Sequence, residues 1–147
     1  MKKKISGTAA IKSVPSHSVV YSGENPTREI AQRLAIWTLN SKDPDWDAVE
    51  ETAPTQWITV AGPGLHSGYL VFRHKNGDES YGSFAGTHMV TVKDDGTWEM
   101  AYEGVKSLMG GTGKFSNIRG ALNYKGKAIP EGEGEKSEFD WEGDVEY

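Results

Sequence analysis

The clearest pattern in the chain is an alternation of apolar and polar side chains in its C-terminal half. Between residues 137 and 147, Phe139, Trp141 and Val145 alternate with acidic residues. A period of two is typical of a strand with one buried and one exposed face. Similar patterns predict strands over residues 65–74, 79–92, 97–106 and 118–128. We therefore expect an antiparallel meander in this half.

Two short turn signals separate the first three of these predicted strands. Residues 75–78 read Lys-Asn-Gly-Asp and residues 93–96 read Lys-Asp-Asp-Gly. Asparagine, aspartate and glycine tolerate the positive φ angles that tight hairpin turns require. Both segments are therefore predicted to be hairpin turns.

The first half of the chain shows a different pattern. Residues 4–14, 19–21 and 57–60 have strand character, but the stretch between them resembles helix. Asn25-Pro26 provides a capping side chain followed by proline at the first helical position. Ile30, Leu34 and Trp37 then follow at helical spacing. A second pair of a capping residue and a proline, Asp43-Pro44, opens residues 43–53, so we expect a short helical insertion over about residues 26–53.

The number of predicted antiparallel strands indicates how the sheet ends. An open sheet of about seven strands would leave two exposed edges, and closure into a barrel removes both. At 147 residues the chain has the size of one domain. We predict a single, mainly β domain over residues 1–147: a closed antiparallel barrel with a helical insertion between early strands. Glycines within the strands are expected where the barrel bends or a ligand approaches the backbone: Gly68, Gly82, Gly86, Gly104, Gly120, Gly126 and Gly143.

Composition excludes several classes of function. The chain has no cysteine, so disulfides and thiolate chemistry are absent. A net charge of -5 argues against nucleic acid as a partner. No run approaches the length of about 18 apolar residues that a membrane span requires. The basic start of the chain is followed by a segment too short and polar for a signal peptide, so we expect a cytoplasmic protein.

The four histidines do not form a metal motif. His17, His66, His74 and His88 lack the close paired spacing of common zinc sites. The chain also lacks a nucleophile elbow and a phosphate-binding glycine loop. We predict neither a metal nor a cofactor.

Aromatic side chains are the best candidates for a ligand site. Strand parity places one aromatic face of each strand in the barrel interior, which gives Tyr69, Trp98, Tyr102, Tyr124 and Trp141 as lining residues. Core packing and ligand binding both remain open for this set. A partly buried His88 is a candidate general acid or base, with a structural histidine as the alternative. His66 and Arg73 are candidates for the mouth of the cavity.

One motif resembles a known family. Residues 110–115, Gly-Gly-Thr-Gly-Lys-Phe, followed by Gly120 and Tyr124, resemble the signature of allene oxide cyclase-like and dirigent-like barrels, which are small calycin-like barrels. The resemblance covers about residues 68–147. It implies an eight-stranded barrel whose cavity takes hydrophobic or phenolic molecules, without a cofactor and as a homo-oligomer, a dimer or trimer. For the motif itself we expect a structural role, because its glycines permit a compact loop.

These observations lead to three hypotheses for function. The first is a cofactor-independent cyclase, isomerase or lyase acting on a small hydrophobic or aromatic molecule. Its predicted catalytic residues are His88, Tyr102 and Tyr69, and its predicted ligand-binding residues are Tyr81, Trp98, Tyr124, Trp141, His66 and Arg73. The second is a non-catalytic binding barrel, which mutual hydrogen bonds among these groups would favour. The third is a structural oligomer with a filled barrel.

Overall fold

Eight consecutive strands form a closed antiparallel barrel in the computed structural model, which describes residues 2–23 and 27–147. Each strand pairs with the next along the chain, and β1 also pairs with β8. The strands are β1 (Lys2–Ser22), β2 (Arg28–Ser41), β3 (Val49–Val60), β4 (Pro63–Arg73), β5 (Glu79–Val92), β6 (Trp98–Gly111), β7 (Arg119–Glu131) and β8 (Gly134–Glu146). The predicted closed barrel of antiparallel strands is confirmed.

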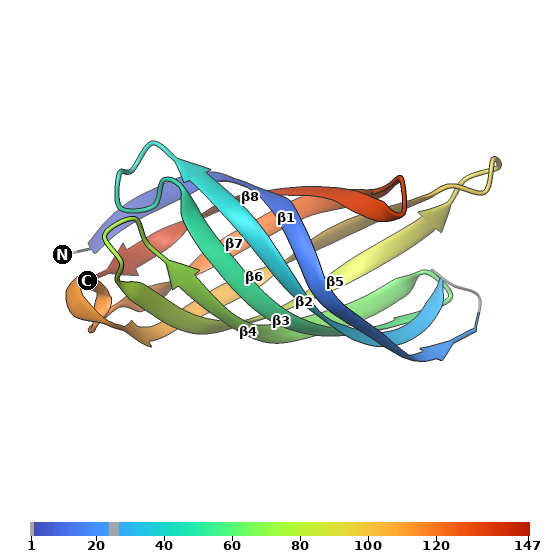
Figure 1. Cartoon of the computed structure of the whole chain (residues 1–147), viewed down its shortest axis with the longest axis horizontal. Coiled ribbons are helices and arrows are strands. Elements are labelled where there is room, and N and C mark those ends of the chain that lie inside the picture. Colours follow the sequence, from blue (N-terminus) through green and yellow to red (C-terminus); the bar gives the residue numbers. More distant parts are fainter. Residues whose placement is uncertain (1, 24–26) are drawn as a thin grey trace.

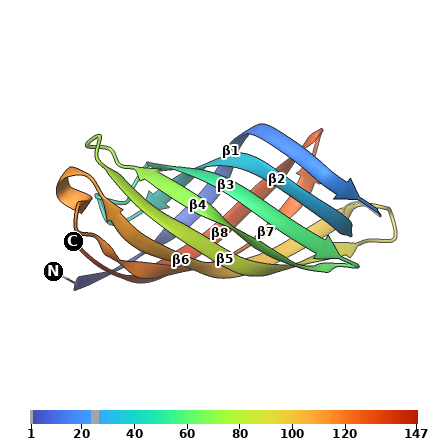
Figure 2. The same cartoon turned by 90° about the horizontal axis from the view of Figure 1, so that it is seen from below.

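The two ends of the barrel differ in their connections (Figure 1). One end, here called the loop end, carries both chain termini and the connections β2–β3, β4–β5 and β6–β7. The other end, here called the turn end, carries the connections β3–β4, β5–β6 and β7–β8. Figure 2 shows the β6–β7 connection curled beside the C terminus at the loop end.

The predicted helical insertion is wrong. Residues 28–41 and 49–60 form β2 and β3, and within the described ranges the one helical element is a 3-10 turn, η1 (Gly113–Phe115). Residues 24–26, which include the predicted Asn25-Pro26 helix start, lie outside the described residues. The second predicted helix start, Asp43-Pro44, lies in the β2–β3 turn and begins no helix.

The error follows from a spacing that both kinds of structure share. The residues that predicted the helix do not share one face of β2: Ile30 and Leu34, four apart, lie on the outer face, and Trp37 lies on the inner face with the buried Ala31, Ala35 and Leu39. Positions four apart lie on one face of a helix and also on one face of a strand. Because the inward face of β2 includes small alanines and polar groups, large apolar and polar residues alternate only weakly along this part of the sequence.

Strand positions in the rest of the chain agree with the sequence to within a few residues. The turns at residues 75–78 and 93–96 join β4 to β5 and β5 to β6, as predicted. The two segments predicted at residues 4–14 and 19–21 are one long strand, β1. Its register against β2 shifts between Ile11 and Ser13 and between Ser13 and Ser16, where bulges bend the strand.

The apolar core lies toward the loop end. Trp46 from the β2–β3 connection is fully buried, and its ring contacts Phe72, Phe115 and Trp141. Aromatic rings with centroids at such separations contribute packing and edge-to-face attraction. Trp46 and Phe115 therefore close the loop end.

The glycine-rich motif at residues 110–115 is part of this closure. The Glu79 backbone N–H donates to Thr112 Oγ1 at 2.9 Å, and the Lys114 N–H donates to Asp78 Oδ2 at 3.0 Å. Gly113 has φ +50°, and a Cβ there would lie 2.2 Å from Asp78 Oδ1. The motif docks the β6–β7 connection onto the β4–β5 turn, which agrees with its expected structural role.

Charged side chains reinforce the loop end from outside. Lys3 forms ion pairs with Asp43 and Asp45 at 2.9 and 3.3 Å, and Lys114 pairs with Asp45 at 2.7 Å. The Tyr147 hydroxyl also donates to Asp45 at 2.8 Å. β1, β8 and two connections are thus tied together around one carboxylate.

In the part of the chain that the structure describes, no helix is long and apolar enough to cross a membrane.

Candidate functional site

Two neighbouring rows of inward residues cross the wall of the barrel from β3 to β7. Register pairs Thr59 with Gly64, Gly64 with His88, and His88 with Tyr102. The second row, one step further from the turn end on β3, runs through Trp57, His66, Gly86, Gly104 and Tyr124. Both rows mix glycines with polar aromatic residues.

Four side chains from these rows form a continuous line of hydrogen bonds, here called the polar row: Thr59, His88, His66 and Tyr124. Thr59 Oγ1 lies 2.7 Å from His88 Nε2, and His88 Nδ1 lies 3.2 Å from His66 Nδ1. His66 Nε2 lies 2.6 Å from the Tyr124 hydroxyl. Each of the four ring nitrogens therefore has a partner inside the barrel.

Three glycines make room for the polar row. A Cβ at Gly64 would lie 2.2 Å from His88 Nε2, and one at Gly86 would lie 2.7 Å from His66 Nε2. A Cβ at Gly104 would lie 2.3 Å from the Tyr124 hydroxyl. His88 reaches Thr59 across β4, and Tyr124 reaches His66 across β6 and β5, because these positions carry no side chain. Gly86 and Gly104, which were predicted to lie where the barrel bends or a ligand approaches the backbone, instead make room for the protein's own rings.

Burial keeps the groups of the polar row uncharged. Burial first, then the facing His88 and the Lys106 ammonium, lower the pKa of His66 to about 4. Burial also lowers the pKa of His88 and raises the pKa of Tyr124 well above its ordinary value. At neutral pH both imidazoles and the phenol are therefore neutral.

A buried ion pair lies next to the polar row, on its loop-end side. The Lys106 ammonium donates to both carboxylate oxygens of Glu51, and both side chains are almost fully buried. Its Nζ lies 4.5 Å from the centroid of the Phe139 ring and 5.4 Å from that of Tyr124. Aromatic faces attract a cation, which partly replaces its lost hydration. The pair marks the middle of the barrel, between the polar row and the loop-end core.

The turn end is more open and more polar than the loop end. Trp57, Trp98 and Met100 remain partly exposed there. Trp57 Nε1 donates to Glu29 Oε1 at 2.9 Å, and the Arg33 guanidinium lies 5.5 Å from the Trp57 ring.

Two further contacts lie close to this turn-end group. Arg33 also forms an ion pair with Glu135 of β8. The Tyr102 hydroxyl lies 2.8 Å from Ser137 Oγ, within the electrostatic reach of both partners of that ion pair. Aromatic faces beside a few fixed polar groups are typical of a small-molecule site.

The predicted site residues divide between the inside and the outside of the barrel. His66, His88, Tyr102 and Tyr124 come together in the interior, and Trp98 lies at the turn end. Trp141 also points inward, but it lies in the core, with its Nε1 donating to the Thr8 carbonyl at 3.0 Å.

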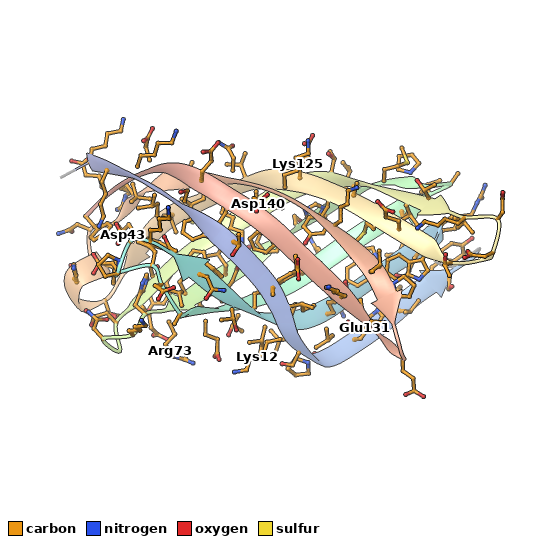
Figure 3. The ribbon with its side chains drawn as sticks, turned by 90° about the horizontal axis from the view of Figure 1, so that it is seen from above. Lys12, Asp43, Arg73, Lys125, Glu131 and Asp140 are labelled. Carbon is orange, nitrogen blue, oxygen red and sulfur yellow. The ribbon has the colours of Figure 1, made fainter. Side chains whose placement is uncertain are left out.

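Three predicted site residues lie on the outer face. Tyr69 is 72% exposed and Tyr81 is 38% exposed. The Arg73 side chain points away from the barrel and pairs with Glu79 at 3.1 Å (Figure 3). The placement of Tyr69, Tyr81 and Arg73 at a cavity is therefore wrong. On β4 the even-numbered residues point inward. The sequence has apolar residues at both even and odd positions of this strand, so it did not show which set is buried.

Sequence reasoning missed several polar residues of the interior. Their shared property is that they lie on inward positions of strands, where apolar residues are expected: Glu29, Arg33, Glu51, Thr59, Lys106, Glu135 and Ser137. Glu51 and Lys106 have opposite charges at inward positions of β3 and β6. Two charges of opposite sign at inward strand positions would have indicated a buried ion pair. This signal was missed because residues 49–53 of β3 were predicted to be helical.

A shallow hollow of about 1560 Å³ lies on the barrel and is lined mainly by outward side chains of β3–β8, among them Leu65, Met89 and Lys125. Lys125 and Asp140 lie beside each other on the outside of β7 and β8 (Figure 3). The hollow therefore lies mainly on the outer surface, although His88 of the polar row and the inward Tyr102 are among its lining residues. We place the candidate site at the turn end of the interior.

Comparison with known proteins supports the fold. Neither a protein family model nor a curated protein sequence matches the chain. Among solved structures, the pterocarpan synthase dirigent protein GePTS1 is similar with a TM-score of 0.56 at 14% sequence identity, covering 99% of this chain and 87% of that one. The pterocarpan synthase dirigent protein PsPTS1 is similar with a TM-score of 0.52 at 16% identity, covering 99% and 94% of the two chains. These likenesses bear out the dirigent-like part of the predicted resemblance and not allene oxide cyclase specifically: the chain has the eight-stranded barrel fold of dirigent proteins.

Proposed function

We propose that this protein binds a small, uncharged aromatic molecule at the turn end of its barrel and holds it in one orientation. The observation that carries the proposal is the mutual pairing of the interior polar groups. Because each ring nitrogen of His66 and His88 already has a hydrogen-bond partner, neither ring has a free nitrogen for a substrate. This pairing favours the binding hypothesis over the predicted general acid–base role of His88.

The turn end offers the surfaces that such a ligand needs. Trp57, Trp98 and Met100 are partly exposed, so a flat ligand can contact them without displacing core residues. The charged groups beside them are paired, Arg33 with Glu135 and Glu29 with the Trp57 indole. A neutral ligand leaves these pairs intact, whereas a charged one would have to break a pair or remain desolvated.

The likeness to dirigent proteins supports the same proposal at the level of architecture. The similar structures are pterocarpan synthase dirigent proteins, so the same barrel fold occurs in proteins named for the synthesis of a small molecule, pterocarpan. Fold alone does not specify a ligand. The choice of an uncharged aromatic ligand rests on the rings and paired charges of this chain.

Binding of neutral aromatic compounds tests the proposal directly. A panel that includes indane, 1-indanone and the charged 1-naphthoate is titrated into the protein, with tryptophan fluorescence and calorimetry as readouts. We expect saturable binding of the neutral compounds, and binding weakened about tenfold in Trp98→Ala, since truncation of an aromatic contact residue commonly removes more than about 1 kcal/mol.

The control for this experiment is Tyr69→Ala, which truncates an exposed aromatic on the outside of β4 and is expected to bind like the parent protein. Tighter binding of 1-naphthoate than of both neutral compounds would contradict the proposal. Failure of every compound to bind would instead favour a filled structural barrel.

A further inference from the structure

Strand β1 continues beyond the seam that closes the barrel and ends at the turn end (Figure 1). Its first half pairs with β8, and this pairing ends at Ala10, opposite Glu138. Among the residues that the structure describes, the second half of β1, up to Ser22, pairs with β2 alone. Alternate backbone groups of an antiparallel strand point away from any one partner, so this half of β1 presents N–H and C=O groups along its other side. We call this side, over residues 16–22, the free edge.

The free edge lacks most of the features that keep an edge strand unpaired. Edge strands commonly carry charged side chains, prolines or bulges, which hinder pairing with a second chain. Pro15 and two shifts of register interrupt β1 before Ser16. From Ser16 to Ser22 the sequence has no proline and no charged residue, although a quarter of the whole chain is charged. One register shift, between Val19 and Tyr21, remains. The backbone is therefore regular and uncharged from Ser16 to Val19.

The side chains of the free edge include exposed apolar groups. Val19 is 45% exposed, Val20 is 71% exposed and Tyr21 is 53% exposed. Every residue from 12 to 22 is exposed, so this half of β1 is uncovered on both faces as well as along one edge. Apolar groups in such a strand gain burial by contact with another molecule.

We propose that the free edges of two copies of this protein pair antiparallel and form a dimer whose two-fold axis lies within residues 16–22. A second copy fits this edge because two identical uncharged strands meet without repulsion between like charges. Around a two-fold axis each hydrogen bond from one copy to the other is repeated in reverse, so both edges are satisfied together. The dimer is independent of the proposed ligand binding.

The free edge lies beside the candidate site. His17 of β1 is the cross-strand neighbour of Arg33, and its ring lies 5.5 Å from the Trp57 ring. Pairing of the free edges therefore brings the turn ends of two copies together. It also makes one sheet that continues from β2 of one copy, through both β1 strands, to β2 of the other.

The oligomeric state of the parent protein is measured first, by sedimentation velocity between about 1 and about 200 μM. We expect a concentration-dependent equilibrium between monomer and dimer. A protein that stays monomeric over this range would overturn the proposal. A trimer would also overturn it, because pairing of two identical edges about a two-fold axis closes at two copies.

Charge at the free edge is changed next. Ser18 and Val19 are adjacent and point to opposite faces, so lysines at both positions oppose those of the partner on either face. We expect Ser18→Lys/Val19→Lys to raise the dissociation constant of the dimer by at least about tenfold. Ser18→Glu/Val19→Glu should do the same. An equimolar mixture of the two variants should form dimers again, because opposite charges then meet. A mixture that stays monomeric, with both variants folded by circular dichroism, would overturn the proposal.

Leu65→Lys/Met89→Lys is the matched control. It places two lysines on another exposed apolar surface, the outer face of β4 and β5, where Leu65 is 61% exposed and Met89 is 48% exposed. This variant should form dimers like the parent protein. If it dissociates while Ser18→Lys/Val19→Lys stays dimeric, the interface lies on the outer face and the proposal is overturned.

A cross-link tests the same contact without added charge and remains decisive if the lysine variants do not fold. The chain has no cysteine. Val19→Cys therefore introduces a single thiol at the free edge, and Tyr69→Cys introduces one on the outer face of β4. Under mild oxidation we expect Val19→Cys to form covalent dimers at least about tenfold faster than Tyr69→Cys, because pairing raises the effective concentration of its thiols. Equal rates would contradict pairing at the free edge.

Discussion

The loop end and the turn end of this barrel are built from the same strands but differ in how their interiors are filled. At the loop end, fully buried rings such as Trp46 and Phe115 fill the interior, and ion pairs around Asp45 fasten the connections outside. At the turn end, tryptophans stay partly exposed and polar groups point inward. We infer from this difference that stability is concentrated at the loop end, which leaves the turn end able to carry partly exposed rings and inward polar groups.

The largest expected effect is at the loop end. Trp46→Ala should lower the free energy of unfolding by about 4 kcal/mol, because it removes a fully buried ring and leaves a cavity. Trp98→Ala at the turn end should lower it by about 1 kcal/mol, since that ring is partly exposed. Urea unfolding followed by circular dichroism measures both values. Equal losses would contradict the concentration of stability at the loop end.

Breaking the Glu51–Lys106 ion pair, which lies between the two ends, should lower the free energy of unfolding almost as much. Lys106→Met should lower the free energy of unfolding by about 3 kcal/mol, because it leaves the Glu51 carboxylate buried without its partner. The double variant Glu51→Leu/Lys106→Met should recover most of this loss, since no buried charge remains. The same urea assay applies, and a double variant as unstable as Lys106→Met would show that the pair itself stabilises the barrel.

Acid should lower the free energy of unfolding in two pH ranges, one set by buried histidines and one by Asp45. Burial is the main reason that the pKa of His66 is about 4 in the folded protein, against its ordinary value of 6.5. Between these values the unfolded chain binds more protons than the folded one, so stability falls as pH decreases from 6.5 to about 4. We expect a loss of about 2 kcal/mol over this range after allowing for partial exposure of the ring.

At lower pH the protein loses the stabilising contribution of Asp45 at the loop end. The Lys114 ammonium, with smaller help from Tyr147 and Lys3, holds the pKa of Asp45 at about 2, against 3.8. Its stabilising effect is present above pH 3.8 and is lost as pH falls toward 2. Urea unfolding at several pH values separates the two ranges. His66→Gln should reduce the loss of stability in the upper range, to which the buried His88 and His74 also contribute because burial lowers their pKa values, and should leave the lower range unchanged. A flattened lower range would refute the assignment.

The smallest effect is expected outside the barrel. Tyr69→Phe removes a hydroxyl from a side chain that is 72% exposed, so the free energy of unfolding should change by less than about 0.5 kcal/mol. Ligand binding should also be unchanged. A loss of binding in this variant would move the site from the turn end to the outer face of β4.

The sequence was informative where alternation was strong and turns were short. Strand β8 and the hairpin turns on either side of β5 followed directly from period-two patterns and from residues that tolerate positive φ. Strands β2 and β3 did not, because their inward faces contain Ala31, Ala35 and Glu51 where a strand normally shows large apolar residues. These positions become buried only when the sheet closes into a barrel. Closure depends on the whole chain, so a local sequence pattern does not show it.

The candidate site was predictable in its residue types but not in its connections. His66, His88, Tyr102 and Tyr124 were all identified, yet the hydrogen bonds that join His88 to Thr59 and His66 to Tyr124 span two or more strands. Such contacts depend on glycines opposite each ring, and one sequence does not show which glycine faces which ring. Tyr69 was wrongly placed in the interior because β4 carries apolar side chains on both faces.

The route of the polar row across β3–β7 has a consequence for the order of folding. These five strands are consecutive hairpin partners, so the row needs only contacts between neighbours along the chain. The seam between β1 and β8 instead joins Lys2 to Glu146 across nearly the whole sequence, and closing so long a loop is entropically slow. We expect the histidine pair to assemble in an open sheet before the seam forms, so that a late folding intermediate already contains the binding residues.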